Sequence, residues 1–469
     1  MLAQRVDRFG AALDPEPIEV ASAGHVSLFA GGAAWNGSVW LVTYSDATQG
    51  KIFARRMLPG GAWLDPAPFF VLLGGGADAA ALGSDFLVTG LRAPSNPQYV
   101  FSYGARVRGV DGVVLDNPAL LVGPSFATRA RVVTLGGQWL VATESHLTHD
   151  ENPANLAFNF VSAAGVVSPA SNAGLLNIQN WGIVDVASSG TSALIVGQSG
   201  SNWTNVDIFV RRILPDGSMP APMLNVTGTA PMGQSRPAVA WTGAEYVVVY
   251  ESLQNNVWFY DYEPDLYAVR LSEAGALLDA SGFPLWNGED YEVNAESASL
   301  GGGKALFAAS TYVDGAYASP RIALRGMRPL GLANYGAGTP GCAGPQRVDA
   351  SSRPFFGNAS FALLSDHAPP GGAGLGLVST VPDVAGSDPL RLGLLVHVGL
   401  FPPAVVVPLV LAADASGLAS VQAPIPPNPA LLGGTLHFQS ASGWPGGPCA
   451  PSPFGLSTSD GLSVTIQSP

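Results

Sequence analysis

The sequence predicts an all-β protein made of a β-propeller followed by a small β-sandwich. Three observations lead to this prediction. Glycine (58 residues) and proline (39 residues) interrupt almost every window that could form a long helix. Short apolar segments recur at a regular spacing, and this recurrence stops near residue 330, where the composition changes. We therefore expect a propeller over residues 1–330, a linker over 331–345 and a sandwich over 346–469.

The most regular feature is an apolar, often aromatic strand, expected to be the second strand of each repeat. Its starts lie 46 to 59 residues apart, a spacing typical of propeller blades. Turn residues divide each repeat into four short strands, as in a blade. The six copies are Trp40–Tyr44, Phe86–Thr89, Trp139–Thr143, Ala193–Val196, Tyr246–Tyr250 and Ala305–Ala308.

A second repeated signature surrounds the turn after the third strand. An arginine stands five residues before a turn glycine in four repeats, and a Leu-Asp pair follows the turn in four. These spacings place arginine and aspartate opposite each other on a hairpin, where an ion pair would set the register. The alternative is a solvated arginine and a turn-shaping aspartate. Either way, repetition marks them as scaffold. The residues are Arg5, Arg56, Arg212 and Arg270, Gly10, Gly61, Gly217 and Gly275, and Asp14, Asp65, Asp116 and Asp279.

The number of repeats predicts a six-bladed propeller. The sixth repeat has no fourth strand before residue 330, whereas the N-terminus begins with the second half of a repeat. We expect the strand Glu16–Val20 to close the ring by completing the last blade, which would remove an open sheet edge. A seventh blade, with further N-terminal sequence, is the alternative. The predicted blades begin near His25, Gly75, Ala127, Trp181, Ser235 and Glu292.

The C-terminal part is almost uncharged and reads as about seven short strands separated by Pro/Gly turns, the pattern of a sandwich. It contains both cysteines, Cys342 and Cys449. They could form one disulfide, which would fit an oxidising compartment, or remain two buried thiols. The apolar stretch 392–413 contains three prolines, so we interpret it as two core strands around a Pro-Pro turn and not as a membrane span.

Several turn motifs of this part together resemble the C-terminal domain of many secreted proteins of planctomycete-like bacteria. The resemblance covers about the last 135 residues, and the propeller repeats are similar to those of secreted bacterial propellers. Both likenesses imply export, and neither carries a known catalytic residue. The motifs are Tyr335-Gly-Ala-Gly, Phe356-Gly-Asn-Ala-Ser-Phe361, Asp366-His-Ala-Pro-Pro-Gly371, Pro424-Ile-Pro-Pro-Asn-Pro-Ala-Leu431 and Ser459-Asp-Gly-Leu-Ser-Val-Thr-Ile466.

The charge balance argues against two classes of partner. The net charge is −13, and Lys51 and Lys304 are the two lysines of the chain. Such a surface has no basic footprint for nucleic acid or an anionic membrane. Met1–Arg5 leads directly into strand-like sequence, so a signal peptide is not visible. We expect a secreted or cell-surface protein whose leader is not part of this sequence.

The loops between second and third strands vary far more than the short turns, so a ligand is expected on their face. Trp203, Trp258, Tyr260 and Tyr262 could stack on sugar rings, or simply pack against neighbouring loops. Glu144 and Glu251 come just after the second strands of their repeats, and their side chains could reach the central opening. All six residues are candidate ligand contacts.

Two loop segments could bind a metal. Asp261, Glu263 and Asp265 alternate like oxygen ligands of calcium, although the glycine and terminal glutamate of an EF-hand are absent. His146 and His149 could bind a transition metal, but no third ligand follows at a fixed spacing, so an exposed polar loop is favoured. Calcium is therefore the one cofactor considered.

Signatures of nucleophilic, phosphate-binding and dinucleotide-binding sites are absent from the sequence. The leading hypothesis is an exported, non-enzymatic protein that binds a glycan or a protein through its loop face. One alternative is a carbohydrate-active hydrolase or lyase using acids such as Glu144, Glu251, Asp261 or Glu263; paired carboxylates roughly 5–10 Å apart would support it. Another is a structural component of the cell envelope.

Overall fold

The computed structural model describes residues 1–468 except 8–9, 11, 22–26, 94–99, 149–150, 177–183, 201–205, 229–232, 253–263, 287–290, 302–303, 314–318 and 445–454. The chain forms two compact units. The first comprises residues 1–299 and 305–326, and the second comprises 300–304 and 327–469. Each unit is described by itself below. Among the described residues, no helix is long and apolar enough to cross a bilayer.

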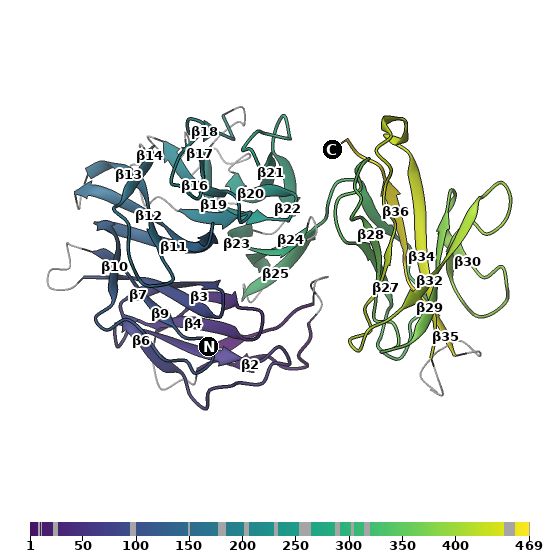
Figure 1. Cartoon of the computed structure of the whole chain (residues 1–469), viewed down its shortest axis with the longest axis horizontal. Helices are drawn as coiled ribbons and strands as arrows, with labels where there is room; N and C mark the ends of the chain where they lie inside the picture. The colour runs from purple at the N-terminus through teal and green to yellow at the C-terminus, as the bar shows by residue number, and fades with distance from the viewer. Residues whose placement is uncertain are drawn as a thin grey trace. The chain divides into compact units, whose positions relative to one another are not determined.

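The first unit is built from antiparallel sheets in which consecutive strands are neighbours (Figure 1). In the described chain five sheets have four strands and one has three. The first two are β3(Leu28–Trp35), β4(Trp40–Asp46), β5(Lys51–Met57), β6(Phe69–Leu73) and β7(Gly75–Leu82), β8(Asp85–Arg92), β9(Phe101–Val107), β10(Leu120–Ser125). The next two are β11(Ala127–Leu135), β12(Gln138–Thr148), β13(Glu151–Val161), β14(Ser171–Leu176) and β15(Asp185–Ser188), β16(Ala193–Gly200), β17(Val206–Ile213), β18(Leu224–Asn225). The last two are β19(Gln234–Trp241), β20(Glu245–Ser252), β21(Asp265–Ser272), β22(Phe283–Trp286) and β23(Tyr291–Gly301), β24(Lys304–Val313), β25(Ser319–Met327).

The first strands of successive sheets contact one another in chain order, from β3 to β7, β11, β15 and β19, which is the arrangement of propeller blades around an axis. The predicted all-β propeller class is therefore confirmed. The number of blades in the complete ring stays a prediction.

The hydrophobic core lies between adjacent blades. One cluster joins apolar residues of the first and second sheets, another joins the third and fourth, and a third joins the fourth and fifth. Second strands are buried on both faces, which explains their uninterrupted apolar sequence. Their first aromatic residue also links blades, because Trp139 Nε1 donates to Ala80 O (3.0 Å) and Tyr246 Oη donates to Ser192 O (2.7 Å) of the preceding blade.

The repeated arginine and aspartate pair across the outer hairpin as expected. Arg56 Nη2 lies 2.5 Å from Asp65 Oδ1, and the equivalent pairs are Arg5–Asp14, Arg106–Asp116 and Arg270–Asp279. Arg106 was not among the four arginines expected from the glycine spacing, because the turn after it is one residue longer.

The structure adds a second role to this pair. The free end of the guanidinium donates to a turn carbonyl of the next blade, from Arg5 to Pro59 O (2.6 Å), from Arg56 to Gly109 O (2.9 Å) and from Arg106 to Ala163 O (2.6 Å). In these three pairs the aspartate therefore holds an arginine that connects two blades.

The N-terminal strand does not pair where the sequence predicted. β2(Ile18–Glu19) pairs with β1(Leu2–Ala3) in a two-stranded sheet, whereas the sheet of β23, β24 and β25 has no fourth strand in the described chain. The prediction that Glu16–Val20 pairs with the last blade is therefore wrong in the described chain. A hairpin around Gly10 closes a short loop, and closure of a short loop costs less entropy than pairing across the whole propeller.

The second unit contains a six-stranded sheet, a three-stranded sheet and a two-stranded sheet. The first orders β26(Leu332–Tyr335), β36(Gly461–Thr465), β34(Thr435–Gly443), β29(Ala373–Ser379) and β32(Val406–Ala412), with β35(Leu456–Thr458) paired to β34. The others contain β27(Arg347–Ala350), β28(Ala362–Asp366), β33(Ala419–Gln422) and β30(Pro382–Ser387), β31(Val396–Val398). Phe361, Phe438 and Leu462 are at most 2% exposed in the core of this unit.

The segment 331–345, expected to be a linker, contributes a strand to this sheet. β26 pairs with β36, and Leu332 is buried in the core of the unit. Its glycine-rich sequence resembles a linker, and the strand forms because these residues pair with residues 461–464. None of the described cysteines is free. Because Cys449 lies outside the described residues, the Cys342–Cys449 disulfide stays a prediction.

Candidate functional site in the propeller channel

The first strands of the propeller surround two cavities of about 440 and 680 Å³ that share lining residues, so they are two ends of one channel. Much of the wall is alanine and glycine. Gly32 shows why: a Cβ on it would lie 2.4 Å from Asp78 Oδ1 and 2.7 Å from Ala79 N. Small residues let the first strands approach the axis closely. Trp35 and Trp241 line the smaller cavity.

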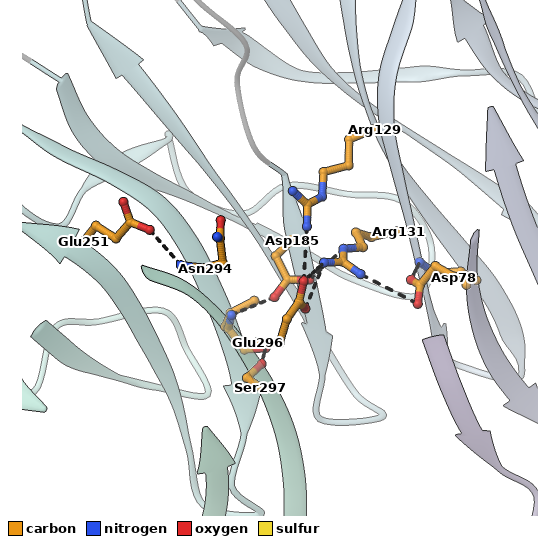
Figure 2. Close-up of polar contacts among 10 residues, drawn as sticks. Asp78, Arg129, Arg131, Asp185, Glu251, Asn294, Glu296 and Ser297 are labelled. Atoms are coloured by element: carbon orange, nitrogen blue, oxygen red, sulfur yellow. Dashed lines mark hydrogen bonds and ion pairs between the residues drawn. The ribbon is translucent and has the colours of Figure 1, made fainter. Parts of the chain in front are cut away.

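Three charged residues occupy one level of the channel. Asp78, Arg131 and Asp185 each pair with the fourth residue of the repeated second-strand segment in their blade, namely Thr89, Ala142 and Val196. The equivalent position of the fifth blade is Ala238, paired with Val249. An arginine thus stands between two aspartates on neighbouring strands (Figure 2).

Both aspartates also accept a hydrogen bond from the backbone of the next blade. Asp78 Oδ2 accepts from Val132 N (2.9 Å), and Asp185 Oδ2 accepts from Val239 N (2.8 Å). Their other oxygens lie 3.9 and 3.6 Å from Arg131 Nη1 and Nε. Because Asp78 and Asp185 act in the same way, this backbone contact is a scaffold role that the repeat provides.

Glu296 completes the cluster from the opposite side of the channel. It lies on β23, and both its oxygens accept from Arg131 Nη2 at 2.6 and 2.9 Å. Arg129 Nη2 lies 3.3 Å from Glu296 Oε1. The Glu296 side chain is 57% exposed although the Arg131 side chain is 15% exposed, so the glutamate faces the open channel (Figure 2).

Burial controls the protonation of the aspartates. Desolvation raises the pKa of Asp185 to about 6, and the positive charge of Arg131 limits this rise. Burial likewise raises the pKa of Asp78. The pKa of Arg129 is lowered, first by burial and then by repulsion from Arg131. Asp185 is therefore a carboxyl group that can carry a proton close to neutral pH.

A repeated hook shapes the mouth beside this cluster. Gln198 Oε1 accepts from Arg236 N (2.8 Å), and Glu251 Oε1 accepts from Asn294 N (2.8 Å). Gln198 and Glu251 both stand five residues after the start of their repeated second-strand segment, and each hook reaches the first strand of the next blade. Arg236 and Asn294 have φ values of 49° and 54°, the left-handed region that non-glycine residues rarely adopt.

This hook corrects the roles expected for Glu144 and Glu251. Both are 0% exposed, so neither presents a carboxylate to the channel. Glu251 acts on the backbone of the next strand, as Gln198 does, and its carboxylate also lies 3.4 Å from Arg236 Nη1. The residue five positions after the start of a second-strand segment has its side chain between two blades. A polar side chain there is buried and therefore needs a backbone partner.

The remaining expected residues fall largely outside the described part of the chain. This applies to Trp203, Trp258, Tyr260, Tyr262, Asp261 and Glu263. Asp265 is described, and it begins β21 opposite Ser252. In the described residues, no group of three His, Cys, Asp or Glu side chains is placed to bind a metal ion. The loop-face and calcium hypotheses stay predictions.

The sequence analysis did not identify Arg129, Arg131, Asp185 and Glu296. One signal was available: charged residues in apolar first strands depart from the repeat, as Arg131 does between Asp78 and Asp185.

No family model and no curated protein matches this chain. Among solved structures, the chain is similar to the α-L-arabinanase of Penicillium chrysogenum complexed with arabinobiose (10% identity, 70% of this chain and 98% of that chain, TM-score 0.43). It is also similar to the α-L-arabinofuranosidase of Fusarium graminearum in complex with an iminosugar inhibitor (11%, 64% and 92%, TM-score 0.43). A third similar structure is a subtype N10 neuraminidase-like protein of A/little yellow-shouldered bat/Guatemala (10% identity, 63% of this chain and 92% of that chain, TM-score 0.41). Similarity this low does not extend to a reaction.

Proposed function

We propose that this protein is an exported carbohydrate-binding protein whose site is the propeller channel. The observation that carries the proposal is the convergence of Arg129, Arg131 and Glu296 in a cavity of about 680 Å³. Cavities of roughly 300–1,000 Å³ with a few convergent polar groups are typical of small-ligand sites. Guanidinium and carboxylate groups together donate to and accept from neighbouring hydroxyls, which suits a sugar.

The other end of the channel supports the same ligand class. Trp35 is 38% exposed and lines the smaller cavity with Trp241. Indole rings offer apolar faces on which sugar rings stack.

Binding of the full-length protein to a panel of neutral and acidic oligosaccharides tests the proposal. We expect at least one saccharide to bind, and Trp35→Ala to weaken binding with the fold intact. Arg108→Gln is the control, because Arg108 pairs with Asp111 on an exposed turn. Absence of binding across the panel, or binding that Trp35→Ala and Glu296→Gln leave unchanged, would overturn the proposal.

Hydrolysis of the bound glycan is a second candidate function, favoured by the pair Asp185 and Glu296. Both carboxyl groups contact Arg131, at 3.6 and 2.6 Å, so they lie within roughly 10 Å of each other, the range used by paired glycosidase acids. Asp185, with a pKa of about 6, would give its proton to the leaving glycosidic oxygen. Glu296 would take a proton from the attacking water or attack the sugar directly.

Release of reducing ends from the bound saccharides tests this candidate. Asp185→Asn and Glu296→Gln should each lower the rate by at least about 100-fold, the typical contribution of a general acid or base. Turnover that survives both substitutions would place the chemistry elsewhere, and binding without turnover would leave the non-enzymatic function.

A further inference from the structure

We infer that the arginine-lined mouth of the channel recognises a carboxylate, so that the preferred ligand is an acidic saccharide such as a uronic-acid oligomer. This inference rests on the proposed carbohydrate function and specifies its substrate class. It is carried by three guanidinium groups that line one small cavity and by one carboxylate of the protein that they bind.

Three arginines line one small cavity of about 30 Å³. Arg129 and Arg131 extend from β11 and Arg236 extends from β19, with Asn294 and Glu296 completing the wall. This volume admits one small group, because a water molecule occupies about 30 Å³ of liquid. Lysine and arginine together number 21 in 469 residues, and the net charge is −13, so convergence of three arginines is exceptional in this chain. The planar fork of a guanidinium matches a carboxylate.

Arg236 is held in this cavity at an energetic cost. Its φ of 49° is unfavourable for a long side chain, and Gln198 fixes that conformation through the Arg236 N–H. Asn294 is held by the same hook one blade later and has a φ of 54°, so the strain belongs to the repeated hook, and the arginine side chain is what this blade adds. The Arg236 side chain is 37% exposed, so its guanidinium can reach a ligand.

Glu296 shows which ligand group the arginines suit. Its carboxylate accepts from Arg131 Nη2 through both oxygens and lies against Arg129 Nη2. Since the Glu296 side chain is 57% exposed, it can turn into the channel and leave its place to a ligand carboxylate.

The charges around the cavity permit this exchange. The charged groups that line it are Arg129, Arg131 and Arg236 with Asp185 and Glu296, while Asp78 and the buried Glu251 contact Arg131 and Arg236 from behind the wall. Exchange of the Glu296 carboxylate for a ligand carboxylate leaves the charge next to the guanidinium groups unchanged. A neutral sugar would instead replace a charge-assisted contact by a weaker one.

Titration calorimetry of the full-length protein with trigalacturonate and with its methyl ester tests the inference. The ester removes the negative charge of each carboxyl group and adds one methyl group to it. We expect the acid to bind at least 10-fold more tightly than the ester at pH 7, and this preference to shrink in Arg236→Gln and in Arg129→Gln. Arg108→Gln is the control, and thermal unfolding of each variant confirms its fold.

The Glu296→Gln variant provides an independent test of the carboxylate exchange. Because an amide competes less well for the guanidinium groups, the variant should bind the acid more tightly and the ester less tightly. Weaker binding of the acid would contradict the exchange of carboxylates.

The outcomes separate the two proposals. If the ester and the acid bind equally, the carboxylate inference is overturned while the carbohydrate function stands. If glutarate, a dicarboxylate without a sugar ring, binds in an Arg236-dependent manner and no saccharide binds, the arginine site stands and the carbohydrate function is overturned. If neither ligand class binds, both are overturned.

Discussion

At the scale of single residues, polar side chains in this propeller either hold the backbone or face the channel. Gln198 and Glu251 bind the backbone N–H of the next blade, whereas Glu296 is exposed to the channel. The distinction follows from the position on the strand. A side chain between blades must satisfy a backbone group. Side chains at the axis differ, because Asp78 and Asp185 bind the backbone of the next blade, whereas Glu296 is exposed to the channel.

The hook of Glu251 leads to a first prediction. Glu251→Gln retains an oxygen that can accept from Asn294 N, as Gln198 does one blade earlier, so this variant should be close to wild type in stability. Glu251→Ala leaves a buried N–H without a partner and should lower the free energy of unfolding by about 1–3 kcal/mol. Urea unfolding distinguishes the two variants. Equal stability of the glutamine and alanine variants would contradict the hook.

The protonation of Asp185 leads to a second prediction. Burial raises its pKa to about 6 in the folded protein, so the folded state binds this proton more tightly than the unfolded chain does. The cost of the buried charge is thus present above pH 6, and it is relieved as the pH falls from about 6 toward 4. Compared with wild type, Asp185→Asn should lack this relief.

The difference in unfolding free energy between wild type and Asp185→Asn should therefore change by on the order of 2 kcal/mol between pH 7 and pH 4, in favour of the wild type at low pH. Chemical denaturation at both pH values measures it. Asp216→Asn on an exposed turn is the comparison, because hydrogen bonds from Ser218 lower the pKa of Asp216 and its substitution should change the pH dependence in the opposite direction. Parallel pH dependence of wild type and Asp185→Asn would contradict the assignment.

At the scale of elements, the outer hairpin of one blade connects to the next through its arginine and aspartate. Removing Asp65 leaves the buried guanidinium of Arg56 without its charge partner and releases its contact with Gly109 O. We expect Asp65→Asn to lower the free energy of unfolding by about 2–4 kcal/mol.

The exposed pair Arg108–Asp111 provides the matched comparison. Its side chains are 45% and 41% exposed, so Asp111→Asn should cost at most about 0.5 kcal/mol. Thermal and urea unfolding of the two variants test the difference. A cost of Asp65→Asn as small as that of Asp111→Asn would show that the repeated pair does not connect blades.

At the scale of the whole molecule, the chain consists of two units with separate hydrophobic cores. We expect calorimetry to show two unfolding transitions, since units with separate cores need not unfold together. Asp65→Asn should lower the midpoint of one transition and leave the other within about 1 °C, a shift below that expected for 1 kcal/mol. A single transition that shifts as a whole would contradict independent units.

Much of the scaffold could be predicted from the sequence because it repeats. The second strands, the turn glycines and the ion pairs such as Arg56–Asp65 depend on local spacing, and local spacing is visible in one chain. Predictions failed where a strand had a choice of partner. Ile18–Glu19 pairs within its own hairpin, and Leu332–Tyr335 pairs with β36 near the end of the chain, with Asn334 opposite Leu462.

The candidate site belongs to the part that only the tertiary structure decided. Arg131 and Glu296 are 165 residues apart in the chain and lie 2.6 Å apart in the channel, because the ring brings first strands from opposite blades to one axis. Neither residue belongs to a motif, and their chemistry arises from this proximity and from the burial that raises the pKa of Asp185. The sequence by itself determined the repeat and hence the blades. Closure around the axis determined which unrepeated side chains meet, since long-range packing is not encoded in any local spacing.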